Sequence, residues 1–102
     1  MKDKNLQIIK TELAPLSPER IILFGSRANG RHSTHSDYDL MLLYKSKIGR
    51  PQKLAIASTA RKRLAEKFID ADIIVKTDSD FEQSKHQIGS ISRQVFQGGI
   101  TL

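Results

Sequence analysis

Two aspartates, Asp37 and Asp39, open an otherwise apolar run, DYDLMLLY (37–44), in a chain of 102 residues. In an extended strand, residues i and i+2 point to the same side with their Cα atoms roughly 6.5–7 Å apart, so both carboxylates should aim at one place. Strand interiors disfavour aspartate, and converging carboxylates raise each other's pKa unless a cation lies between them. Hard oxygen ligands on one face suit Mg²⁺, although a polar loop leading into a strand would also explain these residues.

A third acid, Asp72, opens the apolar run DIIV just as Asp39 opens DLML. A helix-type segment separates the two runs, so the strands are expected to be parallel and to start at the same edge of the sheet. Asp72 should then lie beside Asp37 and Asp39. Asp70 is the competing acid, and we favour Asp72 because it stands at the strand boundary.

Gly25 and Ser26 follow a short β-branched run, RIILF. If that strand is antiparallel to the next one, the turn after it meets the acids. Glycine permits close backbone approach there, and serine offers a hydroxyl and an amide to a phosphate oxygen. Arg27 and Arg31 could contact phosphate beside this turn, with solvated loop charges as the plainer interpretation. Together, the turn and the acids describe a site for a metal-bound triphosphate.

The elements that must position these residues alternate between helix and strand signals. Helices are predicted over residues 3–13, with Asp3 as N-cap, over 51–68, with Pro51 in the first turn, and from residue 78 or 79 to the glycines at 98 and 99. The apolar stripe of the second helix comprises Leu54, Ala57, Leu64 and Phe68. Strands are predicted at 20–24, 37–45 and 71–77, and the last residues, ITL, form a terminal stub. The expected fold is α/β, a single domain over 1–102 with a small mixed sheet of three to four strands and helices packed on it.

Composition narrows the class of protein. Cysteine is absent, which fits the cytosol and excludes disulfides and thiolate metal sites. Seventeen Lys and Arg against eleven Asp and Glu give a net charge of +6, a weak preference for anionic partners. The basic run at 61–63 lacks interleaved aromatics, so a solvated face is preferred to a nucleic-acid patch. Solvated histidines are likewise preferred to a metal site at His32 and His35. No apolar run approaches 18 residues and no signal peptide is evident, so we expect a cytoplasmic protein without a membrane segment.

Gly25-Ser26, ten intervening residues and Asp37-Tyr38-Asp39 match the G-S-x10-D-x-D signature of the nucleotidyltransferase superfamily with the DNA polymerase β palm. The segments LFGSRANG, SDYDLMLLY and ADIIVKT most resemble the minimal nucleotidyltransferases, which are usually antitoxins paired with a HEPN-domain toxin. The resemblance covers nearly the whole chain. One departure is Asn29, which stands where many relatives have a second arginine.

The resemblance implies a two-metal transfer of a nucleoside monophosphate, AMP from ATP, to a hydroxyl, with a tyrosine of the HEPN toxin as the expected acceptor. Asp37 and Asp39 would hold Mg²⁺ on the triphosphate, and Asp72 would complete a second Mg²⁺ site and help to activate the hydroxyl. Gly25, Ser26 and Arg27 would bind the nucleotide's phosphates. Two alternatives stay open: an antitoxin that acts by contact alone, and a nucleotidyltransferase for RNA or a small molecule. The small size of the chain favours association with a partner or a second copy.

Overall fold

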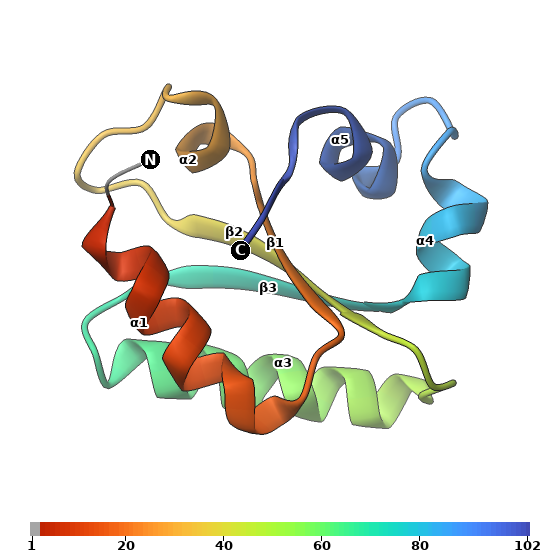
Figure 1. Ribbon diagram of the computed structural model, residues 1–102, viewed down its shortest axis with the longest axis horizontal. Coiled ribbons are helices and arrows are strands. Elements are labelled where there is room, and N and C mark those ends of the chain that lie inside the picture. Colours follow the sequence, from red (N-terminus) through yellow and green to blue (C-terminus); the bar gives the residue numbers. More distant parts are fainter. Residues whose placement is uncertain (1–2) are drawn as a thin grey trace.

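The structure, a computed structural model, describes residues 3–102. A four-stranded sheet in the order β3-β2-β1-β4 lies between two helical layers (Figure 1). Helices α1 (Lys4–Leu13) and α3 (Arg50–Ala65) pack on one face, and α4 (Asp78–Ser84) and α5 (Ile91–Gly98) pack on the other. The α/β class and the mixed sheet predicted from the sequence are confirmed.

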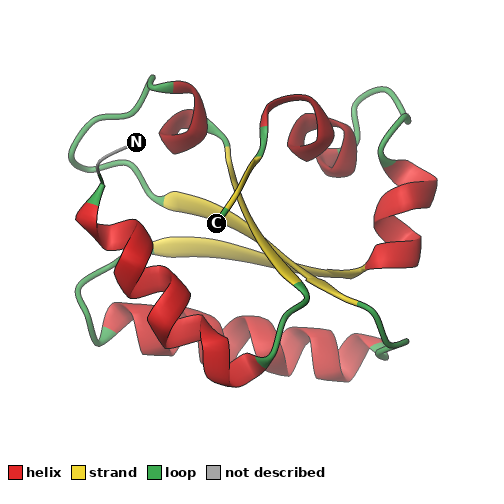
Figure 2. Cartoon of the chain, in the orientation of Figure 1, coloured by secondary structure: helices red, strands yellow, loops and turns green. Residues whose placement is uncertain are grey.

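The pairing of the strands decides which strand ends meet. β1 (Arg20–Phe24) is antiparallel to both of its neighbours, β2 (Tyr38–Tyr44) and β4 (Ile100–Thr101). β2 is parallel to β3 (Ala71–Thr77), and α3 carries the chain from the end of one to the start of the other (Figure 2). The end of β1 and the starts of β2 and β3 therefore lie at the same edge of the sheet, as predicted.

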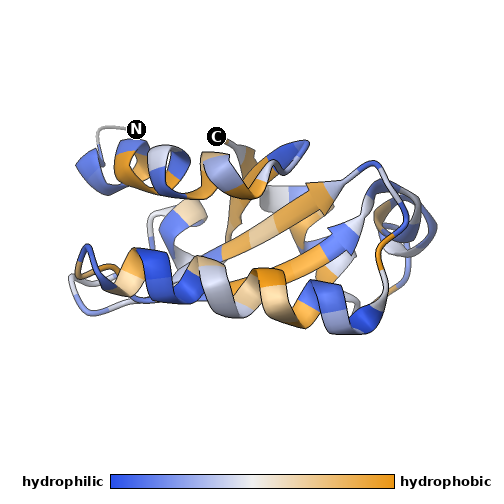
Figure 3. Ribbon diagram, turned by 90° about the horizontal axis from the view of Figure 1, so that it is seen from below, coloured by the Kyte–Doolittle hydropathy of each residue, from blue (hydrophilic) through white to orange (hydrophobic). Residues whose placement is uncertain are grey.

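β2 is buried on both faces, which explains its nearly continuous apolar sequence. Leu40 and Leu42 pack toward α1 and α3, whereas Met41 and Leu43 pack toward α4 and α5. This alternation follows the two-residue period of a strand. In Figure 3 the strands are largely apolar, while many outward-facing helix positions are hydrophilic.

The capping residue and the prolines at the ends of α1 and α3 act as the sequence predicts. Asp3 caps α1, and its side chain accepts a hydrogen bond from the Asn5 amide at 2.9 Å. Pro15 ends the regular helix, and a short 3₁₀ turn, η1 (Ala14–Leu16), follows. Pro51 lies in the first turn of α3, where its missing N–H costs no helical hydrogen bond. Across residues 3–102, no helix is both long enough and apolar enough to cross a membrane.

The C-terminal part of the chain differs from the prediction of one helix and a stub. α4 ends at Ser84, a connection with Gly89 at φ 84° follows, and α5 starts at Ile91. Ile88 lies in this connection and is almost fully exposed. The terminal segment forms β4, because its backbone pairs with Ile22 and Leu23 at the free edge of β1.

The apolar stripe predicted for residues 51–68 is only half right. Ala57 and Leu64 are buried, but Leu54 is exposed, and the helix ends at Ala65. Phe68 lies beyond that end with a positive φ of 61° and a 97% exposed side chain. Phe68 follows Leu64 at a helical spacing in the sequence, but the helix ends before Phe68, so the two side chains do not share a face.

Candidate functional site

The predicted acids lie together at the edge where β2 and β3 begin. Asp39 stands directly opposite Asp72 in the parallel ladder, and Asp37 immediately precedes β2. Tyr38 and Leu40 pack toward α1 and α3, so Asp39 projects from the other face, and Asp72 shares that face through the pairing. We call this group, Asp37, Asp39 and Asp72 with the Gly25-Ser26 turn, the acid edge.

Asp39 is the electrostatic centre of the acid edge. Partial burial raises the pKa of its carboxyl, and the nearby charges of Asp72 and then Asp37 raise it further. Asp37 and Asp72 themselves are exposed. The like charges are thus close enough to disfavour the ionised form of Asp39, which is the condition that a bound cation would relieve.

The donor set fits a hard divalent cation. Within residues 3–102, no three acidic or histidine side chains already form a cluster able to hold a metal ion. Mg²⁺ commonly takes only one or two protein carboxylates and completes its shell with substrate phosphates and water. Asp37, Asp39 and Asp72 therefore suit a metal that arrives with a nucleotide better than a resident structural ion.

Gly25 makes room for Asp39. Its backbone, at φ 72° and ψ −154°, lies in a region that only glycine adopts readily. A Cβ at this position would overlap Oδ2 of Asp39 and come within 3.1 Å of its Cγ. Ser26 follows immediately as the first residue of the short helix α2 (Ser26–Asn29). The predicted meeting of the Gly-Ser turn with the acids is therefore present.

Arg27 is not the solvated loop charge expected from the sequence. Its Nε and Nη2 donate to the carbonyl oxygen of Ser36 at 3.2 and 2.9 Å, and its guanidinium stacks 4.3 Å from the centre of the Tyr38 ring. Asp3 lies 3.9 Å away as an ion-pair partner, and only 12% of the arginine side chain is exposed. Arg27 thus ties α2 to the segment that leads into Asp37. A role in binding phosphate stays a prediction, and it would require these contacts to open.

Tyr38 fixes the strand from its buried side. Its hydroxyl donates to Oδ2 of Asp3 at 2.5 Å and accepts from Nδ2 of Asn5 at 3.3 Å. Burial raises the pKa of Tyr38, and the hydrogen bond to Asp3 raises it further. Tyr44 packs against the same core cluster, and its hydroxyl donates to the Leu16 carbonyl at 2.8 Å. The sequence carried no signal for the contact between Asp3 and Tyr38, because they are 35 residues apart.

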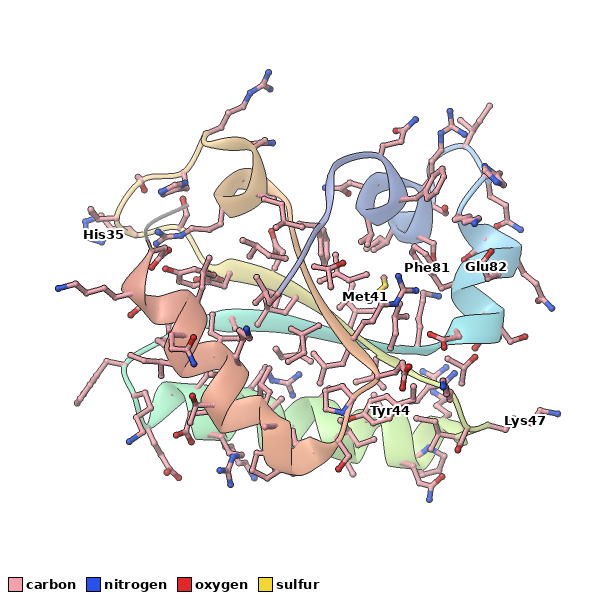
Figure 4. The ribbon with its side chains drawn as sticks, in the orientation of Figure 1. His35, Met41, Tyr44, Lys47, Phe81 and Glu82 are labelled. Carbon is pink, nitrogen blue, oxygen red and sulfur yellow. The ribbon has the colours of Figure 1, made fainter. Side chains whose placement is uncertain are left out.

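The other acid and the loop residues considered for the site are not part of the acid edge. Asp70 is exposed and is not among the charges that raise the pKa of Asp39; its carbonyl accepts a hydrogen bond from the Tyr38 amide at 3.0 Å. Arg31, His32 and His35 are exposed, and His35 stands at the outer end of the loop between α2 and β2 (Figure 4).

A mixed sheet with acids at the starts of two parallel strands and a Gly-Ser turn beside them defines a nucleotidyltransferase palm. The family model for polymerase beta nucleotidyltransferases matches residues 7–102. The chain belongs to this family.

A curated relative agrees with this assignment. The chain is 30% identical over 98 residues to the Probable protein adenylyltransferase MntA of Haemophilus influenzae, covering 94% of this chain and 79% of MntA. The resemblance to minimal nucleotidyltransferases is thereby confirmed.

Solved structures share the fold. One is a toxin–antitoxin with AMP-PNP, at 18% identity and a TM-score of 0.57, covering 99% of this chain and 72% of the matched chain. Another is a variant of the toxin–antitoxin MntA–HpeT, at 23% identity and a TM-score of 0.57, covering 100% of this chain and 72% of the matched chain. At these identities the likeness concerns the fold.

Proposed function

We propose that the chain transfers a nucleoside monophosphate, AMP from ATP, to a hydroxyl of a protein partner in a Mg²⁺-dependent reaction. The carrying observation is the convergence of Asp37, Asp39 and Asp72 beside the Gly25-Ser26 turn. The three carboxylates repel one another, and a bound cation would relieve that repulsion. Gly25, which has no side chain, leaves room beside them for the phosphates of a metal-bound triphosphate. Membership of the nucleotidyltransferase family supports the same reaction.

Each residue then has a role. Asp37 and Asp39 would hold one Mg²⁺ with the triphosphate, Asp72 would complete the site of a second, and the ions would stabilise charge on the attacking and leaving oxygens. The Ser26 hydroxyl and the backbone at Gly25 would bind phosphate oxygens. The acceptor oxygen forms a bond to the α-phosphorus, the bond to the β-phosphate oxygen breaks, and pyrophosphate leaves. The hydroxyl proton would pass to solvent or to Asp72, whose side chain is exposed.

The proposed acceptor is a tyrosine of a HEPN-domain toxin, and the chain would then be its antitoxin. MntA, the relative at 30% identity, is named as a probable protein adenylyltransferase, and two structures with this fold are toxin–antitoxin complexes. One alternative function needs no catalysis. In that alternative the chain neutralises the toxin by contact alone.

Titration calorimetry separates these functions. Mg²⁺ and ATP are titrated into the wild-type chain and into the Asp39→Asn variant, and AMP transfer to a co-purified HEPN-domain protein is followed by intact mass. We expect saturable binding that is lost in the variant, together with mass additions of one AMP each. Asp72→Asn should abolish transfer, and Asp70→Asn, which alters a neighbouring exposed acid, should preserve it. A complex that forms without transfer at any Mg²⁺ concentration would establish the contact-only antitoxin.

A further inference from the structure

Phe68 occupies a backbone position where glycine is normally found. The Phe68 amide donates to the Ala65 carbonyl at 2.9 Å, and the Ile69 amide donates to the Leu64 carbonyl at 3.0 Å. These are the two hydrogen bonds of a Schellman motif, in which the residue at Phe68 must be left-handed. Its φ is indeed 61°. An L-residue with a bulky side chain is strained there.

The side chain of Phe68 gains nothing from the fold in return. It is 97% exposed, while its neighbour Ile69 is buried in the same core cluster as Leu64, the apolar pair that often accompanies this motif. The left-handed backbone lowers the stability of the free chain, and the exposed ring offsets none of that cost. Such a residue is explained by what it contacts outside the chain.

Phe68 lies near the same end of the sheet as the acid edge, but on the face opposite to the one from which Asp39 projects. It lines a polar pocket of about 170 Å³ together with Tyr38, His35 and Asp70. Tyr38 faces α1 and α3, whereas Asp39 projects from the opposite face of the same strand. A nucleotide held by the acids and Ser26 would have to bend around the end of the sheet to reach this ring. A protein surface can cover both places at once.

We propose that Phe68 is the anchor on which the acceptor-bearing protein docks. Aromatic side chains are enriched in the buried core of protein interfaces, where a few well-packed residues carry most of the binding energy. Lys67 and His35 beside it are exposed, and Lys67 forms no ion pair within residues 3–102. The complementary surface is an apolar pocket rimmed by carboxylates. A second copy fits poorly, because two chains that each carry a net charge of +6 repel one another. This inference rests on the proposed protein acceptor.

The test compares the stability of the free chain with its affinity for the partner. Phe68→Gly and Phe68→Asn both suit a left-handed residue, so they should raise the midpoint of thermal unfolding by about 4 °C. The same variants should weaken the complex with the co-purified HEPN-domain protein at least about tenfold in calorimetry. Phe68→Tyr, which keeps the ring, should retain the affinity. Ile88→Asn is the matched control, since Ile88 is 93% exposed in the connection between α4 and α5, on the other face of the sheet. This variant should change neither the affinity for the HEPN-domain protein nor Mg·ATP binding.

Each remaining outcome overturns the docking role in a distinguishable way. Unchanged partner affinity in both Phe68→Gly and Phe68→Asn, with normal binding by the wild type, overturns the docking role and leaves the proposed function standing. Loss of Mg·ATP binding with partner affinity intact would assign the ring to the nucleobase. A wild-type dimer that dissociates in Phe68→Gly, with partner affinity intact, would assign it to a second copy. If the wild type neither binds nor modifies the HEPN-domain protein, the proposed acceptor and the docking role fall together.

Discussion

Replacing Gly25 with alanine should damage the acid edge and also cost stability. At φ 72° and ψ −154° the backbone of Gly25 lies where a residue with a Cβ pays about 1–3 kcal/mol. The added methyl would also overlap Oδ2 of Asp39, so either the turn or the carboxylate must move. A domain of this size has about 5–15 kcal/mol of stability in total, so the variant should still fold.

Gly30→Ala is the matched control for this substitution. Gly30 also has a positive φ, 78°, but a Cβ there would meet nothing within 4 Å. Alanine at Gly30 should therefore cost about 1 kcal/mol, the strain of a left-handed L-residue alone. At about 4–8 °C per kcal/mol for a domain of this length, we expect the melting temperature to fall by about 5 °C in the control and about 10 °C or more in Gly25→Ala.

Thermal unfolding and Mg·ATP calorimetry on the two variants measure the two effects separately. The control should bind Mg·ATP like the wild type, whereas Gly25→Ala should lose binding because Asp39 no longer occupies its place. If Gly25→Ala has the same melting temperature as Gly30→Ala and binds Mg·ATP normally, then the close approach of Gly25 and Asp39 has no part in the site.

Two further predictions concern charge. The pKa of Asp39 is raised, so the stability that this group contributes is present below its unfolded pKa, near the ordinary 3.8, and is lost as the pH rises through the raised value. Without metal, Asp39→Asn should therefore become more stable than the wild type as the pH rises toward neutrality; Asp80→Asn should do the opposite, because a lysine hydrogen bond lowers the pKa of Asp80. Urea unfolding between pH 3 and 7 measures both, and a pH-independent difference for Asp39→Asn would contradict the assignment. In the same assay at neutral pH, Arg27→Lys should lower the free energy of unfolding by about 2 kcal/mol, since lysine cannot reproduce the stacked, two-donor contact. Arg31→Lys, at an exposed position, should change it by no more than about 0.5 kcal/mol. Equal losses in the two variants would show that the contacts of Arg27 do not stabilise the fold.

The acid edge could be predicted from the sequence because each part of it has a local signal. Apolar β-branched runs mark the strands, an acid begins two of them, and the handedness and direction of a strand–helix–strand unit bring their starts together. The Gly25 turn required one further assumption, that β1 is antiparallel to β2, which the structure bears out. None of these steps needed contacts between distant side chains.

What escaped prediction depends on such contacts or on backbone pairing. The contact between Arg27 and Tyr38 also involves Asp3, the N-cap residue of α1, which lies 35 residues before Tyr38. β4 has only two residues, too few for a pattern, and exists because β1 offers a free edge. Phe68 continued the helical period of α3 in the sequence, and only the hydrogen bonds that end the helix reveal that its side chain turns outward.

The parallel ladder between β2 and β3 also governs how this chain can change over evolution. Asp39 and Asp72 share a face because they are paired, and the side chains of a strand alternate with a period of two. A slip of one residue would bury Asp72 among the side chains that pack on α3 and turn Ile73 toward the acids. Insertions in the exposed connection 45–49 leave that pairing intact, whereas a single inserted residue at 70–71 would shift it. Length variation among descendants of this chain should therefore accumulate after β2 and be purged just before β3.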